Sequence, residues 1–509
     1  MKPTRLGRTA VFLWCLAVLA LVASACGSND DDSTGEGVVT APTAAAPTAP
    51  DEGDGGAQGE DASAPSAEDA DREPAQAPSE GDADDADGPA DQPAPAEPDT
   101  TAEPTPTPTP VVLTASYQGV TESEIVIGVA AIDPIQINEM FGIDIGIFPV
   151  DKLYQALSDD LNSRGGINGR NVITHVVSFL PIGAADSERV CTELIEDKRV
   201  FVVIGQFIED NALCITELHG HPYVGHFGEN AERQERSDGL LFATEMEQTR
   251  QRVGGVTEMI RAGDLDGYNV GLYYEAPPDK AYVEAVRPLL EEAGINVVGE
   301  YSPGAPSTDT VANEIATDSI TQRMEADGID MILNVSNVYG VIQSVQRIGW
   351  EVPIAMTNGQ AADRLSVPDD QNIEDEVLAR TFAVTTNKPT REEALADPGV
   401  ARCLAAFQEH HPDEPLDLTS SDVVNGLTNH CRAFALTVKI LEAAGGNITP
   451  ETFRAAAEGL GTFDLPAMVN ASLSPDKHSA GSLVRRYEYF PEARTWLPVG
   501  EPIATEAVG

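Results

Sequence analysis

The sequence predicts an α/β protein built from two doubly wound, parallel-sheet lobes. Short apolar runs rich in β-branched residues alternate with amphipathic stretches, the order expected of βαβ units in a parallel sheet. This alternation occupies about residues 121–503, a length sufficient for two lobes of ordinary domain size. The pattern restarts near residue 248, which indicates where the second lobe begins.

The first lobe should begin with four strands separated by three helices. Its strand segments are short and rich in valine and isoleucine, and its helical segments repeat apolar residues at helical spacing. The expected strands are 125–131, 172–179, 200–205 and 223–225, and the expected helices are 150–163, 185–198 and 211–218.

The second lobe repeats the same alternation. Its expected helices are 248–262, 279–293, 310–326 and 339–348, and its expected strands are 270–274, 295–301, 331–335 and 353–357. Two further strands are expected at 483–489 and 495–499.

The N-terminus has the layout of an export signal, with Lys2, Arg5 and Arg8 before an uncharged apolar run. The run Ala23-Ser24-Ala25-Cys26 resembles the bacterial lipobox, in which the cysteine receives a diacylglycerol and becomes the new N-terminus. Residues 1–25 are therefore expected to be a lipoprotein signal peptide, with lipidation at Cys26. The protein would be extracytoplasmic and lipid-anchored to the bacterial cell membrane. The alternatives are an ordinary secreted protein and an uncleaved anchor, although the apolar run is shorter than the ~20 residues of a spanning helix.

Residues 26–115 read as a disordered stalk rich in acidic residues, proline and alanine, because such a composition buries too little apolar surface to fold. A Ca²⁺-binding tract is the alternative, but the segment lacks the loop pattern of an EF-hand. The whole chain has 83 Asp and Glu against 31 Lys and Arg, a net charge of −52. Nucleic acid is therefore excluded as a partner, since binding it requires a basic surface.

Four cysteines remain after Cys15 in the signal and Cys26. Three connectivities are open, and the local one pairs Cys191 with Cys214 and Cys403 with Cys431. Disulfides fit an oxidising compartment. A thiol nucleophile or a metal cluster is the alternative reading of these cysteines.

Several motifs resemble type I periplasmic binding proteins of the leucine/isoleucine/valine-binding group, the substrate-binding family of branched-chain amino acid ABC transporters. They occur in the family's order over about residues 121–503. The motifs are Asn162-Ser163-Arg164-Gly165-Gly166-Ile167-Asn168-Gly169-Arg170, Val202-Val203-Ile204-Gly205, Tyr273-Tyr274-Glu275, Ala326-Asp327-Gly328-Ile329-Asp330 and Ile348-Gly349-Trp350-Glu351-Val352-Pro353-Ile354.

The glycines of the first motif have a structural interpretation. Gly165 and Gly166 should end a helix with positive φ, and Asn168-Gly169 should form a tight turn. A phosphate-binding glycine loop would instead follow a strand and open a helix. We therefore expect no nucleotide site here.

The resemblance implies a hinge crossed three times, near Thr244, near Thr385 and before Ser482. Lobe 1 would then comprise residues 121–244 and 387–478, and lobe 2 residues 245–386 and 479–503. It also implies a solute-binding protein that closes around a small polar ligand, such as an amino acid or an amide, and delivers it to an ABC permease in the membrane.

Ligands of open parallel sheets bind at the carboxyl ends of the strands. The candidate ligand-binding residues are those that directly follow the predicted strands. In lobe 1 they are Asp133, Gln206, Phe207, Glu209, Asp210, His226 and Phe227, and in lobe 2 they are Tyr274, Glu275, Asn337 and Asn358.

The resemblance places a serine, and a threonine or small residue, where amino-acid-binding relatives hold the ligand carboxylate. Glu209 and Asp210 stand near the first position and His226 near the second, so a ligand carboxylate would be repelled unless a cation intervenes. Asp210 as the N-cap of a helix is the alternative. Phe207, Phe227 and Tyr274 could be apolar walls of a ligand site or parts of the core.

No catalytic motif is present, so the protein is not expected to be an enzyme, and no cofactor or metal is implied. His221 and His226 lie at opposite ends of a strand and cannot share one metal ion. Two alternatives stay open. The module could be a ligand-sensing receptor without a transport role, or a surface protein that has lost ligand binding.

Overall fold

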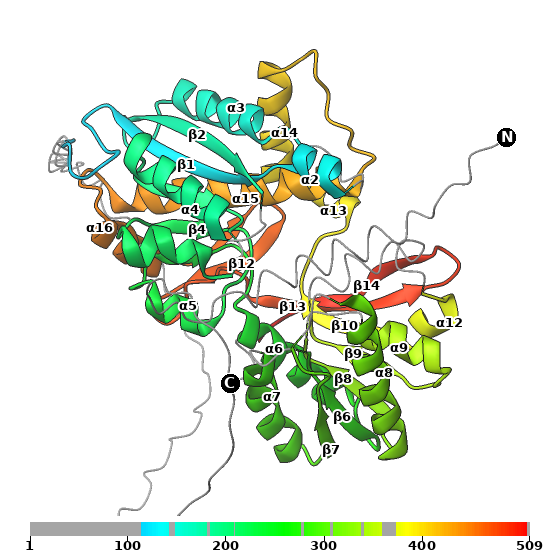
Figure 1. The fold of residues 1–509 in the computed structure, drawn as a ribbon. Coiled ribbons are helices and arrows are strands. Elements are labelled where there is room, and N and C mark those ends of the chain that lie inside the picture. The colour runs from blue at the N-terminus through cyan, green and yellow to red at the C-terminus, as the bar shows by residue number, and fades with distance from the viewer. Residues whose placement is uncertain are drawn as a thin grey trace, which may run out of the picture. The chain divides into compact units, whose positions relative to one another are not determined.

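The computed structural model describes residues 113–141, 148–180, 184–207, 209–275, 279–305, 309–336, 340–358 and 373–505. Cys26 and Asn337 lie outside these residues, as do the predicted signal peptide and nearly all of the predicted stalk. The described part contains two sheets of mainly parallel strands, each covered by helices (Figure 1). The predicted fold class is confirmed.

The first sheet has the strand order β2-β1-β3-β4-β5, and all of its pairings are parallel. Its last three strands are buried at every residue, because helices cover both faces. The strands are β1 (Glu124–Ile132), β2 (Asn171–Phe179), β3 (Val202–Gly205), β4 (Tyr223–Gly225) and β5 (Leu241–Ala243).

Two helical layers bury the faces of this sheet. One shares a hydrophobic core with β1 and contains α3 (Val150–Ser163), α14 (Pro398–His410), α15 (Ser421–Ala444) and α16 (Pro450–Glu458). The other packs the opposite face and contains α4 (Ala184–Thr192), the π-helical η2 (Glu193–Asp197), the 3₁₀-helical η3 (Glu209–Ala212) and the π-helical η4 (Cys214–Leu218). The described residues also form three short helices, α2 (Pro134–Phe141), α5 (Ala231–Arg236) and α13 (Arg391–Ala396).

The second sheet has the order β14-β13-β10-β9-β8-β6-β7. The strands from β10 to β7 pair in parallel, and β13 and β14 extend the sheet as antiparallel strands. The strands are β6 (Asn269–Tyr273), β7 (Asn296–Tyr301), β8 (Met331–Asn334), β9 (Ile354–Met356), β10 (Thr381–Thr386), β13 (Leu483–Phe490) and β14 (Thr495–Ala504).

Helices cover both faces of the second sheet as well (Figure 1). On one face lie α6 (Gln248–Ala262) and α7 (Lys280–Glu292). On the other lie α8 (Thr310–Ala326), α9 (Gly340–Ile348) and α12 (Asp375–Leu378). A separate hairpin of β11 (Gly461–Leu465) and β12 (Met468–Leu473) contributes to the core of the first sheet.

The chain passes between the two sheets three times. The first passage follows β5, the second follows β10, and the third precedes β13. The second is fixed to β13, since the backbone N–H of Lys388 donates to the Tyr487 hydroxyl (2.7 Å) and that hydroxyl donates to the Lys388 carbonyl (2.9 Å). At the third, a Cβ on Gly481 would lie 2.6 Å from the backbone nitrogen of Met246, so only glycine permits this approach.

The glycine turn after α3 has the predicted geometry. Gly165 and Gly166 have φ of 102° and 65°, and Asn168 has φ of 51°. A Cβ on Gly166 would lie 1.9 Å from the carbonyl oxygen of Arg170, so the turn requires glycine. The motif is structural and joins α3 to β2.

Only one of the two expected disulfides is formed. Cys191 of α4 and Cys214 of η4 are joined, with their Cα atoms 6.3 Å apart. The expected bond between Cys403 and Cys431 is wrong, since both are free thiols buried between α14 and α15. The two thiols are hydrogen-bonded to each other, and burial raises the pKa of Cys431. The thiolate that disulfide formation requires is therefore disfavoured at this position.

None of the helices among the described residues combines the length and the apolar character required of a membrane span.

Candidate functional site

The carboxyl ends of β3 and β4 carry a network of charged side chains. Asp210 of η3 accepts hydrogen bonds from Arg233 (2.9 Å) and Arg236 (2.7 Å), both on α5. Arg233 also donates to Glu229 at 3.1 Å, and Arg236 to Glu217 at 2.9 Å. The network therefore joins the segments that follow the two strands.

Pairing controls ionisation in this network. Partial burial opposes ionisation of Asp210, but hydrogen bonds from Arg233 and Arg236 lower its pKa below the usual value. Glu229 is 5% exposed, and its burial raises its pKa even though Arg233 counteracts the effect. Arg233 thus supplies positive charge between two carboxylates at the strand ends.

This network overturns the alternative reading of Asp210 as a helix N-cap. Asp210 lies within the 3₁₀ turn η3, and its carboxylate bonds to arginine side chains. Sequence reasoning missed α5. Its signal is present, since Asn230 caps the helix by accepting from the backbone N–H of Arg233. A six-residue helix with no buried residue has no apolar periodicity to detect.

Of the other lobe 1 candidates, some stabilise the fold and others are accessible to solvent. Asp133 caps α2, accepting from the backbone N–H groups of Ile135 and Gln136 at 3.0 Å each. Phe207 is core, 3% exposed and packed on Phe179 and Tyr223. The accessible ones are Gln206, which is half-buried, and Phe227, which is 36% exposed. The backbone of Glu209 opens η3, and its side chain lies outside the described residues.

His226 is buried directly after β4, at 2% exposure. Its ring packs edge-to-face on His430 of α15, with centroids 4.5 Å apart, and neither of its ring nitrogens has a partner among the described residues. His430 stacks on Phe148 and lies 3.3 Å through Nδ1 from the Tyr154 hydroxyl. Burial lowers the pKa of His226 well below normal and that of His430 to about 3, so both are neutral.

The lobe 2 candidates meet at the ends of β6, β8 and β9. The backbone N–H of Glu275 donates to the Ser336 hydroxyl oxygen at 3.3 Å, and the Asn358 amide donates to the Ser336 carbonyl at 3.4 Å. Ser336 also donates to Asp279. Tyr274 lies under the ammonium of Lys280, 5.8 Å from its ring centroid. The structure thus gathers Glu275 and Asn358 around Ser336.

Glu275 is the most perturbed carboxyl group of this cluster. Burial raises its pKa to about 8, although the bond from the Tyr273 hydroxyl (3.2 Å) opposes the shift. At neutral pH the group is therefore mostly protonated and can donate a hydrogen bond. With Asp279 close by, a neutral acid reduces charge repulsion at this edge.

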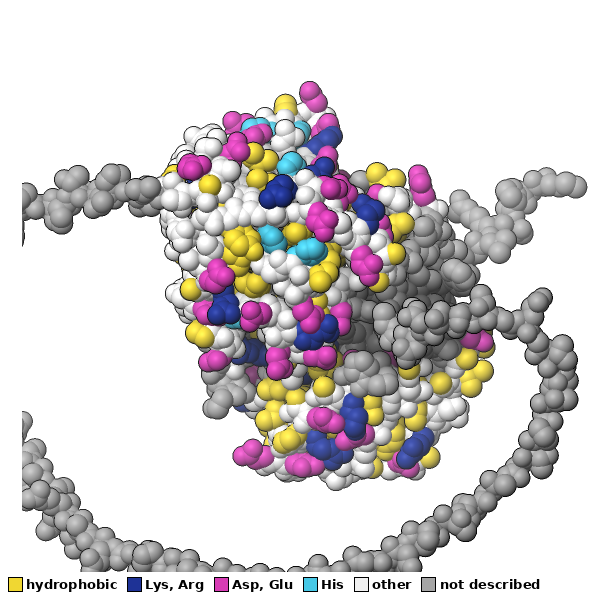
Figure 2. Space-filling model, turned by 60° about the vertical axis from the view of Figure 1, so that its left-hand side comes forward, with side chains coloured by type: hydrophobic (Ala, Val, Ile, Leu, Met, Phe, Trp, Pro, Cys, Tyr) yellow, Lys and Arg dark blue, Asp and Glu magenta, His cyan; other side chains and the backbone are white. Residues whose placement is uncertain are grey.

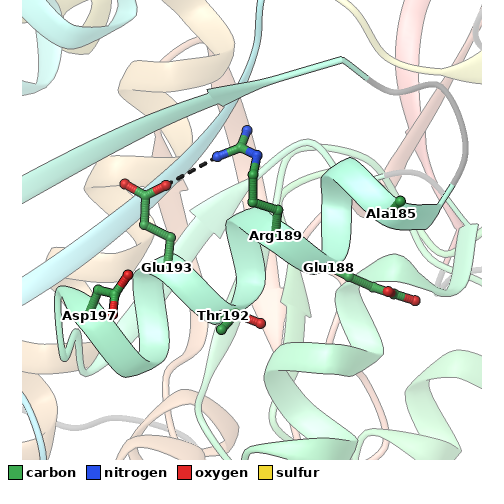
Figure 3. A pocket seen from close by; sticks show the side chains of 6 residues that line it. All are labelled: Ala185, Glu188, Arg189, Thr192, Glu193 and Asp197. Carbon is green, nitrogen blue, oxygen red and sulfur yellow. Dashed lines mark hydrogen bonds and ion pairs between the residues drawn. The ribbon is translucent and has the colours of Figure 1, made fainter.

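A wide hollow of about 430 Å³ lies elsewhere, over α4 and η2 (Figure 3). Its only basic side chain, Arg189, is bound to Asp186 and Glu193. The lining side chains lie along the outer side of the helix, with no buried polar group among them. This hollow is therefore ordinary helix surface.

Acidic and basic side chains also lie close together over the face shown in Figure 2.

Comparisons with known proteins agree with the fold. Residues 153–486 match the family model described as "Periplasmic binding protein". No curated protein sequence matches the chain.

Several solved structures are similar in fold at low identity. An ABC transporter substrate-binding protein from Desulfitobacterium hafniense in complex with Leu has 14% identity and a TM-score of 0.52, covering 74% of this chain and 100% of that one. A solute-binding protein from R. palustris in complex with 4-hydroxybenzoate has 18% identity and a TM-score of 0.53, covering 75% of this chain and 96% of that one. A possible leucine/isoleucine/valine-binding protein from Rhodopirellula baltica SH 1 has 13% identity and a TM-score of 0.50, covering 77% of this chain and 98% of that one.

Proposed function

The chain belongs to the periplasmic binding protein family, and from this membership we propose that it is a solute-binding protein of an ABC importer. It captures a small polar ligand, such as an amino acid, an amide or a related compound, between its two lobes. The observation that carries the proposal is the family match over residues 153–486, which spans strands of both sheets. Solved structures of similar fold hold leucine and 4-hydroxybenzoate.

The ligand contacts are assigned to the carboxyl ends of the strands. In lobe 1 the accessible groups are Gln206 and Phe227, beside the network of Asp210 and Arg233. In lobe 2 they are Tyr274 and Glu275, which are half-buried. Ser336 accepts from the backbone N–H of Glu275, and the Asn358 amide donates to the Ser336 carbonyl. Aromatic walls with a few polar groups are what small-molecule sites use.

The charge of this edge bears on the ligand class. The carboxylate of Asp210 is matched by two guanidinium groups, so a ligand carboxylate would not meet an unpaired negative charge there. Neutral Glu275 can donate to a ligand oxygen. Both features are compatible with amino acids and their amides.

Membrane attachment completes the proposal. The lipobox-like run ending at Cys26 would give a lipid-anchored protein outside the cytoplasm, with residues 26–115 as the tether. Mass spectrometry of the N-terminal peptide from native membranes tests this. A diacylglyceryl mass on Cys26 supports it, and an unmodified cysteine or a different cleavage site contradicts it.

Thermal unfolding of the purified chain tests ligand capture. The panel contains amino acids, amides, polyamines, sugars, nucleosides and aromatic acids. A ligand at a hundred times its dissociation constant should stabilise the protein by about 2.7 kcal/mol. A branched-chain amino acid hit would match the family's leucine-binding members. Silence across the panel would contradict the proposal and favour the alternative of a surface protein that has lost ligand binding.

A further inference from the structure

The three segments that join the lobes enclose a small cavity of about 20 Å³. This volume holds one water molecule or one monatomic ion. All three passages contribute to its wall, together with side chains of lobe 1. The lining residues are Glu245 and Met246, then Thr386, Asn387 and Lys388, then Gly481, Ser482 and Leu483, with Arg432, Met468 and Val469.

Arg432 is the buried cation of this cavity. It lies on α15, is 4% exposed, and donates from Nε to the Pro466 carbonyl and from Nη2 to the Ala467 carbonyl, both at 3.1 Å. Both of these acceptors are backbone carbonyls, and neither bond goes to a carboxylate. A guanidinium removed from water without a carboxylate bond is costly, and burial lowers its pKa. An anion in the cavity would offset this cost.

The remaining charges around the cavity also favour an anion. Lys388 pairs with Glu245 at 4.0 Å. Lys477 is 7% exposed and donates to the hydroxyl of Ser482, which lines the cavity. Asp397 acts on Arg432 electrostatically, but it caps α14 through the backbone N–H groups of Gly399 and Val400. Three cations thus surround the cavity against two carboxylates.

Asn387 provides an independent indication of a missing partner. Its Oδ1 is buried and has no hydrogen-bond partner among the described residues. Buried polar atoms are nearly always hydrogen-bonded, so the unpaired amide oxygen indicates that an ion or a water molecule occupies the cavity. Because the oxygen and nitrogen of an amide are assigned from their partners, rotating the group would direct Nδ2 to an anion as a donor.

We propose that this hinge cavity binds a small inorganic anion of the size of chloride, held by Arg432, and that the anion adjusts the equilibrium between open and closed lobes. The cavity is formed by all three passages, so movement of one passage relative to another changes its shape. An ion that fits one arrangement better shifts the equilibrium towards it. The site is separate from the strand ends and needs no organic ligand for its test.

Two measurements on the purified chain test the proposal. The first is the unfolding temperature in sodium chloride against sodium gluconate at equal ionic strength, which keeps charge screening constant. We expect chloride to raise it by roughly 2 to 4 °C. The second is a crystal structure with bromide, in which anomalous scattering should place the ion beside Nη1 of Arg432.

Variants separate anion binding from folding. Arg432→Met should abolish the chloride effect, and Asn387→Asp should abolish it by placing a carboxylate in the wall while keeping side-chain size. Arg402→Met, which removes an exposed arginine of α14, should leave the effect intact. Water alone in the cavity, or equal unfolding temperatures in chloride and gluconate, would overturn the proposal. A chloride effect retained in Asn387→Asp would also do so.

Discussion

Arg233 donates from Nε to Oδ1 of Asp210 at 2.9 Å, and this bond joins the end of β3 to the helix that follows β4. The same guanidinium donates from Nη1 to the buried carboxylate of Glu229. One cation therefore holds two acids in the region proposed to receive the ligand. The repulsion that the sequence suggested for a ligand carboxylate is offset here by a residue that the sequence reasoning did not single out.

Replacing Arg233 should destabilise the first lobe. Arg233→Met leaves Glu229 buried without its cation, and we expect a loss of roughly 2 kcal/mol in unfolding free energy by denaturant titration at pH 7. The matched control is Arg236→Met, whose side chain is 38% exposed, and which should cost under about 1 kcal/mol. Restoration of stability by adding Glu229→Gln to the Arg233 variant would locate the cost at Glu229. Equal losses in the two arginine variants would contradict this account.

The histidine pair predicts sensitivity to acid. His430 has a folded pKa of about 3, below the usual 6.5, and burial also lowers the pKa of His226. The unfolded chain therefore binds more protons between about pH 3 and 6.5, so stability falls as pH decreases through that window. From pH 6.5 to 5, His430 alone should cost about 2 kcal/mol.

Denaturant titration of the wild type and His430→Phe at both pH values measures this slope. Phenylalanine keeps the ring contacts with Phe148 and His226 but cannot bind a proton. The variant should lose less stability on acidification. As a control, His175→Phe removes a half-buried histidine outside this cluster. If stability falls with decreasing pH as steeply in His430→Phe as in His175→Phe, the assignment of the acid sensitivity to His430 is refuted.

Glu275 predicts the opposite pH slope. Its folded pKa of about 8 lies above the ordinary 4.5, so the folded chain binds the extra proton, and stability falls as pH rises from about 4.5 to 8. Glu275→Gln keeps the hydrogen-bonding shape without the ionisation. It should raise the unfolding free energy at pH 8 by roughly 1 kcal/mol, a value reduced for the solvent exposure of this side chain. Calorimetric unfolding at pH 5 and pH 8 measures it, and a gain at pH 5 as large as that at pH 8 would exclude this cause.

The cysteine assignment predicts two titratable thiols. In protein lacking residues 1–26, Ellman's reagent under denaturing conditions should find two thiols per chain, Cys403 and Cys431, since Cys191 and Cys214 are joined. The double variant Cys191→Ser/Cys214→Ser should lose roughly 3 to 4 kcal/mol, because the bond joins residues separated by 23 positions and restricts the unfolded chain. Cys403→Ala should cost less than that and leave the other bond intact. A count of zero thiols would show that the second disulfide forms after all.

Several elements have the bounds that the sequence predicted. Helix 150–163 and strand 223–225 coincide with α3 and β4, and helix 310–326 coincides with α8. The helix expected over 211–218 is instead a 3₁₀ turn followed by a π-helix. Helical spacing of apolar residues indicates a helix but does not distinguish among its hydrogen-bonding patterns.

The site was predicted less completely, for a physical reason. The rule about strand ends identified Asp210 and Glu275, but not the residues that set their charge. Arg233 pairs with Asp210 across 23 residues, and burial in the packed lobe raises the pKa of Glu275. Phe207, which also follows a strand, turns into the core instead. Such pairings depend on tertiary packing, which periodicity does not encode.

The discontinuous lobes determine when the protein can fold during synthesis. The core of the first sheet includes Ile127 near one end of the described chain and Ala480 near the other. The second sheet gains its last two strands only from β13 onward. Neither core is complete until almost the whole polypeptide has emerged. Complete tertiary structure in either lobe therefore has to wait for the segments that follow β12.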